Sequence, residues 1–319
     1  MNKTTNKVLY YTLTNFVWIT LIGIYVAMGI LSPFFFTFEN FENILVHMVG
    51  LGTLSLGLMF VLMLGEIDLS VTSNAALGAF LGVYIIKTYN IPVLLGILFI
   101  LLFGAGIGTL NGLLVRYLGV PSLIATISMD YILRGSLLSL LKGTSYSGFP
   151  DEYLWLGSVS LFGIRLVYVA YFLLAFITYF IFNYTKIGKR ICLVGGDRNA
   201  ALMGGLNERR IALTGFILCG IFSGIAGFLL SSRMNVVTPI FMQAYLLPAI
   251  AAPVIGGVSL FGGVGEVKGT LAGVFLLQTI STGLIVIGVS AYLLQTVQGI
   301  MIAIAICIDA LRRKFYRTY

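Results

Sequence analysis

The sequence predicts an all-α protein, a polytopic bundle of about ten transmembrane helices. Its composition is the first reason: of 319 residues, 59% are hydrophobic and 9% are charged, whereas roughly 25% of the residues in an ordinary soluble domain are charged. Repeated long apolar runs are the second reason, because a helix that crosses the hydrocarbon layer needs about 20 predominantly apolar residues. The placement of basic residues is the third. We expect one transmembrane domain over residues 1–319.

The apolar runs are bounded by glycine, proline, asparagine and charged residues, which set the approximate ends of each predicted span. The first follows Lys3 and Lys7 and is too long for a signal-peptide core, so we expect an uncleaved span. The third is short, and a tight turn at 90–92 leads into the fourth. The predicted spans cover residues 9–31, 43–63, 72–89, 92–115, 121–141, 164–184, 211–231, 241–258, 269–287 and 291–311.

Basic residues indicate the orientation of the chain, since they concentrate in cytoplasmic loops. With ten spans and a cytoplasmic N-terminus, fourteen of the 19 Lys and Arg residues fall on the cytoplasmic side and four on the outside. Both termini are therefore expected to face the cytoplasm. The net charge of +8 is spread over short gaps between apolar runs. Such scatter argues against a nucleic-acid partner, which would require a basic stripe.

A short break after the second span carries Glu66 and Asp68. Asp68 or Ser70 is expected to cap the next helix, whose N-terminal partial charge favours an acid. An ion-coupling role for the two acids is the alternative. The segment 62–70 is echoed at 253–260, and each is followed by an apolar run. The echo predicts two repeats, made of spans 2–5 and 7–10, packed around a common pathway.

The longest internal polar segment, residues 185–210, is predicted to lie on the cytoplasmic side. Asp197 is positioned to cap a short helix through Ala200 and Ala201, and the pair 204–205 to end it. We interpret this helix as a docking element that couples the spans to a partner protein, with a basic lipid-facing linker as the alternative. The candidate coupling residues are Gly188, Lys189, Arg190, Gly195, Gly196, Asp197, Ala200, Ala201, Gly204 and Gly205.

Charged side chains inside a membrane are costly, which makes Asp130 and Arg134 in the fifth span functional candidates. They lie one helical turn apart, and Thr126 and Ser122 continue the same stripe. The stripe fits either an ion pair packed against other helices or a wall of the solute pathway. The candidate pathway residues are Glu66, Asp68, Ser122, Thr126, Asp130 and Arg134.

Small residues and aromatic residues mark two further surfaces. Glycines at close spacings are expected to let helices approach tightly within the chain, with a dimer seam as the alternative. They include Gly104, Gly106, Gly108, Gly220, Gly224 and Gly227. The external segment 142–163 contains Asp151, Glu152 and Trp155. We expect it to lie on the external side, where a partner protein would meet it.

The residues that an enzyme or a metal site would need do not occur in a suitable pattern. His47 is the only histidine, and the three cysteines lack CxxC spacing, so no metal site is expected. The pair 188–189 is the one Gly-Lys pair, but Asn183 and Arg190 stand where a phosphate-binding loop needs Gly and Ser or Thr. We expect neither catalysis nor a bound cofactor, so another subunit or an ion gradient must supply the energy.

Four segments, in the same order, resemble the permeases of the ribose/branched-chain amino acid importer family. Residues 65–71 (GEIDLSV) are similar to the motif GGIDLSVG, and residues 120–126 with 134–135 resemble P-F-I-A-T…R-G. Residues 188–206 match its G-R…A-x-G-G-N…A-A…S-G-I stretch in part. Residues 249–263 resemble A-I-A-A-V-V-I-G-G-T-S-L-x-G-G. The match most resembles the sugar branch of the family.

The resemblance implies a bacterial inner-membrane importer for a monosaccharide or a related small molecule. Two permease copies, identical or sister subunits, would pair around a pathway. ABC ATPase subunits would hold the ATP, and an extracytoplasmic solute-binding protein would deliver the solute. Residues 245–249 (YLLPA) lack the family's acidic pair, Pro253 replaces a valine and Glu66 replaces a glycine. These departures leave the solute open. A secondary transporter driven by an ion gradient is the alternative function.

Overall fold

The computed structural model describes residues 16–161, 163–290, 293–301, 303–304 and 307. This part of the chain is helical apart from four strands of two residues each, which confirms the predicted all-α class. In the described residues, six helices are long and apolar enough to cross a membrane. They are α3 (Phe38–Leu62), α5 (Val93–Arg116), α6 (Ser122–Leu141), α8 (Leu166–Tyr184), α11 (Glu208–Met234) and α13 (Val267–Val286).

Two other predicted spans form helices of a different kind. Helix α2 (Phe16–Leu31) has 16 residues, and residues 9–15 of its predicted span lie outside the described part. Helix α4 (Val71–Tyr89) begins with the polar residues 72–74 and is buried along its first half. The final predicted span, 291–311, lies partly outside the described residues.

The predicted span 241–258 is interrupted. Met242 adopts a left-handed backbone with φ 60°, and the short 3-10 helix η1 (Gln243–Tyr245) follows it. The α-helix that remains, α12 (Leu246–Ile255), has ten residues. It is about 15 Å long, half of the roughly 30 Å hydrocarbon thickness. The apolar composition of this run therefore overstated its helical length.

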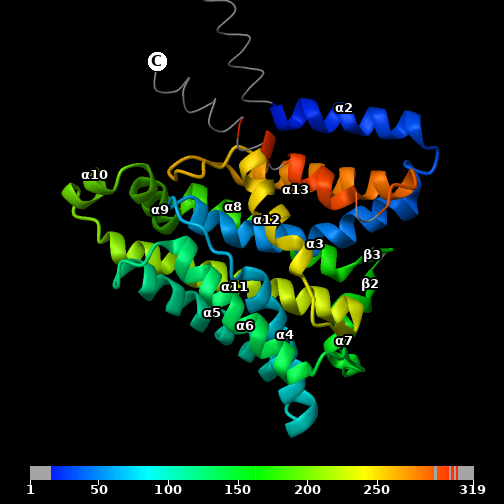
Figure 1. Ribbon diagram of the computed structural model, residues 1–319, viewed down its shortest axis with the longest axis horizontal. Coiled ribbons are helices and arrows are strands. Elements are labelled where there is room, and N and C mark those ends of the chain that lie inside the picture. The colour runs from blue at the N-terminus through cyan, green and yellow to red at the C-terminus, as the bar shows by residue number, and fades with distance from the viewer. Residues whose placement is uncertain (1–15, 162, 291–292, 302, 305–306, 308–319) are drawn as a thin grey trace, which may run out of the picture.

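The helices lie side by side, and the short elements gather at two opposite ends of the bundle (Figure 1). Helices α9 (Lys186–Gly196) and α10 (Arg198–Met203) project at one end. At the other end lie α7 (Asp151–Ser158) and the antiparallel pair β2 (Ser160–Leu161) and β3 (Ile164–Arg165). A second antiparallel pair joins β1 (Tyr146–Ser147) to β4 (Val236–Val237).

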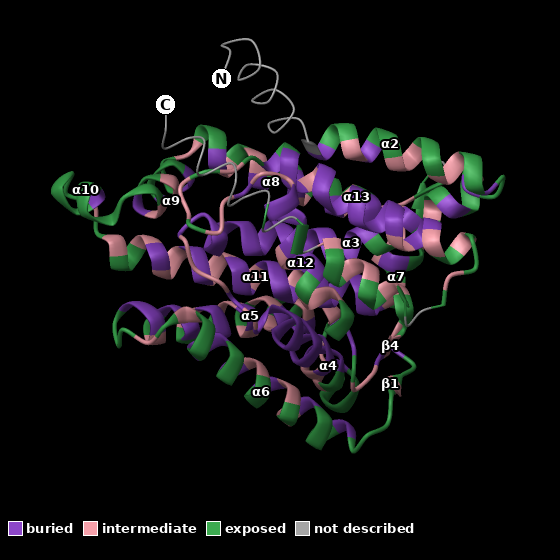
Figure 2. Ribbon diagram, turned by 45° about the horizontal axis from the view of Figure 1, so that its top comes forward, coloured by how far each residue is buried: buried purple, intermediate pink, exposed green. Residues whose placement is uncertain are grey.

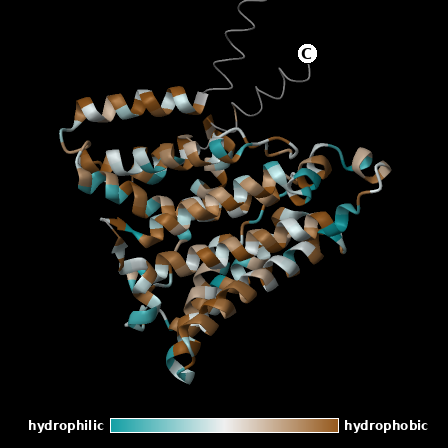
Figure 3. Cartoon of the chain, turned by 180° about the vertical axis from the view of Figure 1, so that it is seen from behind, coloured by the Kyte–Doolittle hydropathy of each residue, from teal (hydrophilic) through white to brown (hydrophobic). Residues whose placement is uncertain are grey.

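The core is built around α3. Of the most apolar 18-residue stretch of each helix, 83% is buried in α3 and 67% in α11 and α13, but 28% in α5, α6 and α8. Figure 2 shows the same contrast, with buried residues concentrated on the inner helices and exposed ones on α6 and α2. The helix bodies are mainly hydrophobic on their outer faces as well (Figure 3). In a bilayer, such outward apolar side chains face lipid.

Glycines bring α5 and α11 into close backbone contact. A Cβ on Gly104 would collide with the carbonyl of Gly220, and a Cβ on Gly108 with the carbonyl of Phe216. The predicted close packing within the chain is therefore confirmed for these helices. Gly106, in contrast, faces open space, because its position on α5 points away from α11.

Candidate functional site

The break between α3 and α4 is an irregular segment pressed against neighbouring helices. Within it, Asp68 is 2% exposed, and its Oδ1 accepts hydrogen bonds from the Ser70 amide at 2.8 Å and the Ser70 hydroxyl at 2.7 Å. The Asn111 side-chain amide donates to the other oxygen of Asp68 at 3.3 Å. The carboxylate thus joins the break to α5.

The expected side-chain cap of α4 is not formed. Ser70 occupies the N-cap position with a helical backbone (φ −84°, ψ −3°) and makes no side-chain cap bond. A capping side chain usually needs an extended backbone at this position. Asp68 instead binds Ser70 itself, so it fixes the residue before the helix and leaves the first helical turn uncapped by side chains.

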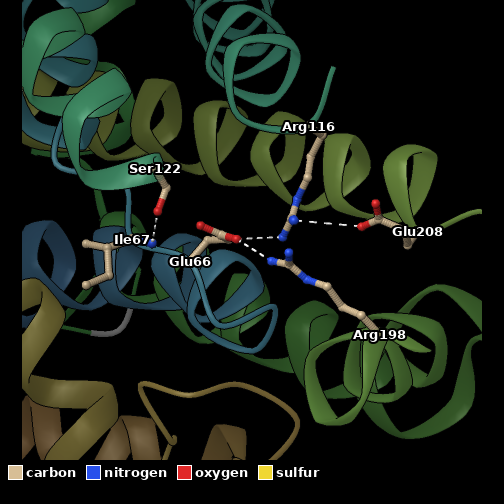
Figure 4. Close-up of polar contacts among 6 residues, drawn as sticks. All are labelled: Glu66, Ile67, Arg116, Ser122, Arg198 and Glu208. Carbon is tan, nitrogen blue, oxygen red and sulfur yellow. Dashed lines mark hydrogen bonds and ion pairs between the residues drawn. The ribbon is translucent and has the colours of Figure 1, made fainter. Parts of the chain in front are cut away.

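Glu66 lies at the centre of a group of four charged residues, which we call the charge cluster: Glu66, Arg116, Arg198 and Glu208. One oxygen of Glu66 lies 2.7 Å from Arg116 Nη2 and 2.6 Å from Arg198 Nη2. Arg116 Nη1 lies 3.7 Å from a carboxylate oxygen of Glu208. Figure 4 shows the side chains converging from four separate segments. The cluster therefore connects the α3–α4 break with α5, α10 and α11.

Burial differs strongly within the charge cluster. The Arg116 side chain is 5% exposed and that of Glu66 is 12% exposed, whereas Arg198 is 47% exposed. Two acids and two bases make the cluster neutral. A charge buried this deeply depends on its partners, since desolvation otherwise destabilises it. Arg198 is the accessible member, and it lies on the short helix that projects from the bundle.

Helix α10 forms as the sequence predicts. Asp197 Oδ1 accepts hydrogen bonds from the amides of Asn199 at 2.9 Å and Ala200 at 3.0 Å. Gly204 is the C-terminal cap, and Gly205 has a φ of 76°, which suits glycine. The capped helix sets the direction of Arg198 toward Glu66.

Helix α9 was not predicted from the sequence. Thr185 accepts a hydrogen bond from the amide of Gly188, which begins the helix, and Ile191 and Val194 are buried against the bundle. A Cβ on Gly188 would collide with the carbonyl of Ile181 in α8. Packing therefore stabilises a short, glycine-containing helix that local propensity alone would not favour.

The end of α9 lies where two irregular segments meet. The first break joins α3 to α4, and the second break, residues 256–266, joins α12 to α13. The Gly263 amide donates to the carbonyl of Met63 at 2.9 Å, which joins the second break to the first. A Cβ on Gly195 would collide with the same Met63 carbonyl, and one on Gly262 would lie 2.7 Å from the Gly65 nitrogen. Backbone contacts thus hold α9 against both breaks.

The predicted coupling residues divide into two groups. Gly188 and Ala201 are buried, and Gly195 packs against the breaks. The others are exposed: Lys189, Arg190, Gly196, Asp197, Ala200, Gly204 and Gly205. The exposed group also includes two apolar side chains that the sequence analysis did not single out, Leu202 and Met203, which are 52% and 92% exposed.

The predicted stripe on α6 meets the break at its first two positions. The Ser122 hydroxyl accepts from the Ile67 amide at 3.4 Å (Figure 4). The Thr126 hydroxyl accepts from the Leu69 amide at 3.0 Å. Both hydroxyls therefore satisfy backbone groups that leave regular helix at the break.

The other two positions of the stripe do not form the expected ion pair. Arg134 donates to the carbonyl oxygens of Phe241 at 3.1 Å and Pro239 at 3.4 Å, and Asp130 is not within ion-pair distance of it in the described residues. The irregular segment before α12 supplies free carbonyls, which draw the guanidinium away. Asp130 Oδ1 is buried without a hydrogen-bond partner in the described part of the chain.

Sequence reasoning missed the partners of both acids in the break. Arg116, Arg198 and Glu208 pair in the charge cluster, and Asn111 binds Asp68. The sequence did carry a signal, because Arg116 ends α5 and Arg198 begins α10. Both of these helix ends lie beside the α3–α4 break. Their pairing with Glu66 depends on helices that are distant in sequence.

The family model described as "Branched-chain amino acid transport system / permease component" matches residues 40–306. The chain belongs to this family. The match covers both breaks, helices α9 and α10 and the whole charge cluster. This chain is therefore the membrane permease of an ATP-driven, binding-protein-dependent importer, a multi-pass inner-membrane protein. It is not itself an enzyme, and the ATP is held by a separate subunit.

Curated relatives match the permease over nearly its full length. It is 32% identical over 292 residues to the L-arabinose ABC transporter permease protein AraH of Azospirillum brasilense, covering 91% of this chain and 85% of the relative. It is 34% identical over 286 residues to the ribose import permease protein RbsC of Bacillus subtilis, covering 89% and 88%. The galactose/methyl galactoside import permease protein MglC of Haemophilus influenzae is 31% identical over 315 residues, 93% of each chain. No solved structure matches the permease.

Proposed function

We propose that the permease carries a pentose or hexose into the bacterial cell after a solute-binding protein delivers it. Its relatives are named for L-arabinose, ribose and galactose, which are neutral monosaccharides. ATP hydrolysis on partner subunits would drive alternating access by pushing on the segment 185–210. The chain would act as one transmembrane domain over residues 1–319.

The contact between Arg198 and Glu66 carries this proposal. Arg198 begins the projecting helix α10, and its guanidinium lies 2.6 Å from a carboxylate that belongs to the α3–α4 break. A displacement of α10 would therefore pull on the break and on the ends of α5 and α11 through Arg116. The contact of Gly195 with Met63 would carry the same displacement through α9.

The surface of α10 suits a protein partner. Its exposed Leu202 and Met203 provide an apolar contact, and the preceding helix α9 carries the exposed basic residues Lys189 and Arg190. An apolar centre with a charged rim is the usual anatomy of a protein interface. We propose that the ATPase subunit docks here, with Gly204 and Gly205 allowing close approach.

Ten spans with both termini in the cytoplasm fit this arrangement. The segment 185–210 and the external segment 142–163 occupy opposite ends of the bundle in Figure 1. The exposed Asp151, Glu152 and Trp155 on α7 would meet the solute-binding protein. The contact between the breaks 63–70 and 256–266 supports two repeats facing a common pathway.

A second permease copy, identical or a sister subunit, would complete the pathway. Ser122 and Thr126 would hold the break that lines it, and Arg134 would fix the segment before α12. Asp130 is the proposed pathway residue with a buried oxygen that lacks a partner in the described residues.

Reconstitution in liposomes tests the proposal. The permease, its ATPase and its binding protein should import D-ribose, L-arabinose or D-galactose when ATP is enclosed on the side of the membrane where the ATPase is bound. An ionophore should not stop this uptake. Permease without ATPase should import none of them. Uptake by the permease alone, driven by a salt or pH difference, would contradict the proposal and favour the ion-gradient alternative.

A further inference from the structure

A cavity of about 220 Å³ lies at the other end of α3 and α13 from the charge cluster. Six polar side chains line it, contributed by α3, η1, α13 and the segment near residue 298. They are His47, Tyr245, Gln278, Ser281, Thr282 and Gln298. The sequence alone indicated only that His47, as the single histidine, is not expected to bind a metal.

Three of the polar side chains lie on one face of α13. Gln278, Ser281 and Thr282 line the cavity with the spacing of one helical face, and the apolar Leu277 and Ile285 of the same helix line it as well. Part of the wall is already organised: His47 Nδ1 lies 3.0 Å from the Tyr245 hydroxyl, and Gln298 donates to the Ser281 hydroxyl at 3.2 Å. These two pairs hold four of the six polar side chains at the edges of the cavity.

Two further side chains face the cavity without a partner. Gln278 and Thr282 are each 6% exposed, and neither side chain has a hydrogen bond in the described part of the chain. Buried polar groups in proteins almost always have a partner, in the protein or in a bound molecule. One carboxamide and one hydroxyl, a helical turn apart, therefore point to a polar occupant that both donates and accepts.

The lining also defines the chemistry of that occupant. Among the described residues that line the cavity, His47 alone is of a type that titrates near neutral pH, and no Asp, Glu, Lys or Arg offers a fixed charge to an ion. Leu51, Pro248 and Leu277 add apolar walls. Neutral donors and acceptors beside apolar carbon suit a molecule with many hydroxyls on a carbon ring. The volume equals that of about seven waters, which a pentose or hexose would displace.

We propose that this cavity is a binding site for a neutral monosaccharide at the outer end of the permease, with Gln278 and Thr282 as the central contacts. This inference rests on the proposed function and adds the place where the chain itself holds the sugar. Sugar released by the binding protein would replace the water around these two side chains. The absence of a cationic group predicts that a phosphorylated sugar is not bound.

Chemical protection of His47 tests the site directly, because it is the only histidine in the chain. The full-length permease in nanodiscs would be treated with diethylpyrocarbonate, and modification of His47 followed by mass spectrometry. At least one of D-ribose, L-arabinose and D-galactose should slow modification by about threefold or more, because a bound ligand excludes the reagent. D-ribose 5-phosphate should not.

Two variants on α13 provide the matched comparison. Thr282→Val and Gln278→Leu should each abolish the protection. Thr279→Val removes a hydroxyl that is also buried and unpartnered in the described residues but does not line the cavity, so it should keep the protection. Equal protection in Gln278→Leu and the unmodified chain, or no protection by any of the three sugars, would overturn the inference.

Uptake by the complete importer separates this inference from the proposed function. Gln278→Leu should reduce uptake by about tenfold, as expected when a buried polar contact is lost, while Thr279→Val should not. If the unmodified importer takes up sugar with ATP and Gln278→Leu is equally active, the cavity site is wrong and the function stands. If the unmodified importer takes up none of the three sugars, the proposed function fails.

Discussion

The two ends of α3 carry opposite kinds of polar group. At the end of α3 that adjoins α4, the charge cluster joins four segments through ion pairs between 2.6 and 3.7 Å long. At its other end, neutral side chains surround a cavity, and two of them lack partners in the described residues. Strong, directional contacts suit the charge cluster, which we propose transmits movement. Weak, neutral contacts suit the cavity, from which we propose the sugar is released.

The two regions also differ in how they respond to the loss of one group. Removing one member of a buried ion pair leaves its partner charged and desolvated, which destabilises the protein. Removing an unpartnered hydroxyl from the cavity leaves no such charge. Damage to the charge cluster should therefore affect folding or coupling, whereas damage to the cavity should affect the proposed binding of sugar alone.

Among these substitutions, Gly195→Val is expected to have the strongest effect, because it disrupts the contact between α9 and the α3–α4 break. Any side chain at this position collides with the carbonyl of Met63, and backbone cannot move aside as a flexible side chain can. Uptake should fall by about a hundredfold or more, as overpacking displaces α9 from both breaks. Gly196→Val is the control, because a Cβ added at Gly196 would lie 3.9 Å from its nearest neighbouring atom, the Cα of Gly263. Similar uptake by the two variants would contradict the role of this contact.

Arg116→Met should destabilise the fold. The Arg116 side chain is 5% exposed, and its removal leaves Glu66 and Glu208 without their shared partner. A loss of about 3–5 kcal/mol is typical when one member of a buried pair is removed. Thermal unfolding in detergent, followed by size-exclusion chromatography, would measure it. Exposed Arg210, changed to Met, is the control, and an unfolding temperature equal to the control's would refute the prediction.

Arg198→Ala should leave the fold intact but weaken coupling. Its side chain is 47% exposed, so its loss costs less stability than that of Arg116. We expect ATP hydrolysis by the assembled importer to continue while sugar uptake per ATP falls by about tenfold, as for a lost charge-assisted contact. Normal coupling in Arg198→Ala would remove the main support for the proposed function.

Asp68→Asn should have the smallest effect of these substitutions. Asparagine keeps an oxygen that accepts from the Ser70 amide, but its own amide faces that of Asn111. We expect uptake to fall only a few-fold, about the effect of one weakened hydrogen bond. Complete loss of uptake, with a shifted dependence on pH or sodium, would instead indicate ion coupling at this carboxylate.

Several elements were predictable because their causes are local. The all-helical membrane class follows from composition and run length, and the short helix α10 follows from Asp197 at its start and Gly204 at its end. Repeated glycines predicted that helices approach closely within the chain, but only the structure shows that α5 and α11 are the helices that meet. Helix α9 was not predictable in this way, because buried Ile191 and Val194 stabilise it through contacts with other helices.

The sequence by itself determined that this chain crosses a membrane, where its main helices run and which family it belongs to. Hydropathy and helix capping depend on neighbouring residues, so they can be read along the chain. Only the tertiary structure decided that Glu66 pairs with Arg116 and Arg198, 50 and 132 residues away, and that Arg134 binds backbone carbonyls instead of Asp130. It also decided that His47, Tyr245 and Gln278 share one cavity. Such partners are chosen by the packing of distant helices, because a buried polar group binds whichever group that packing places beside it.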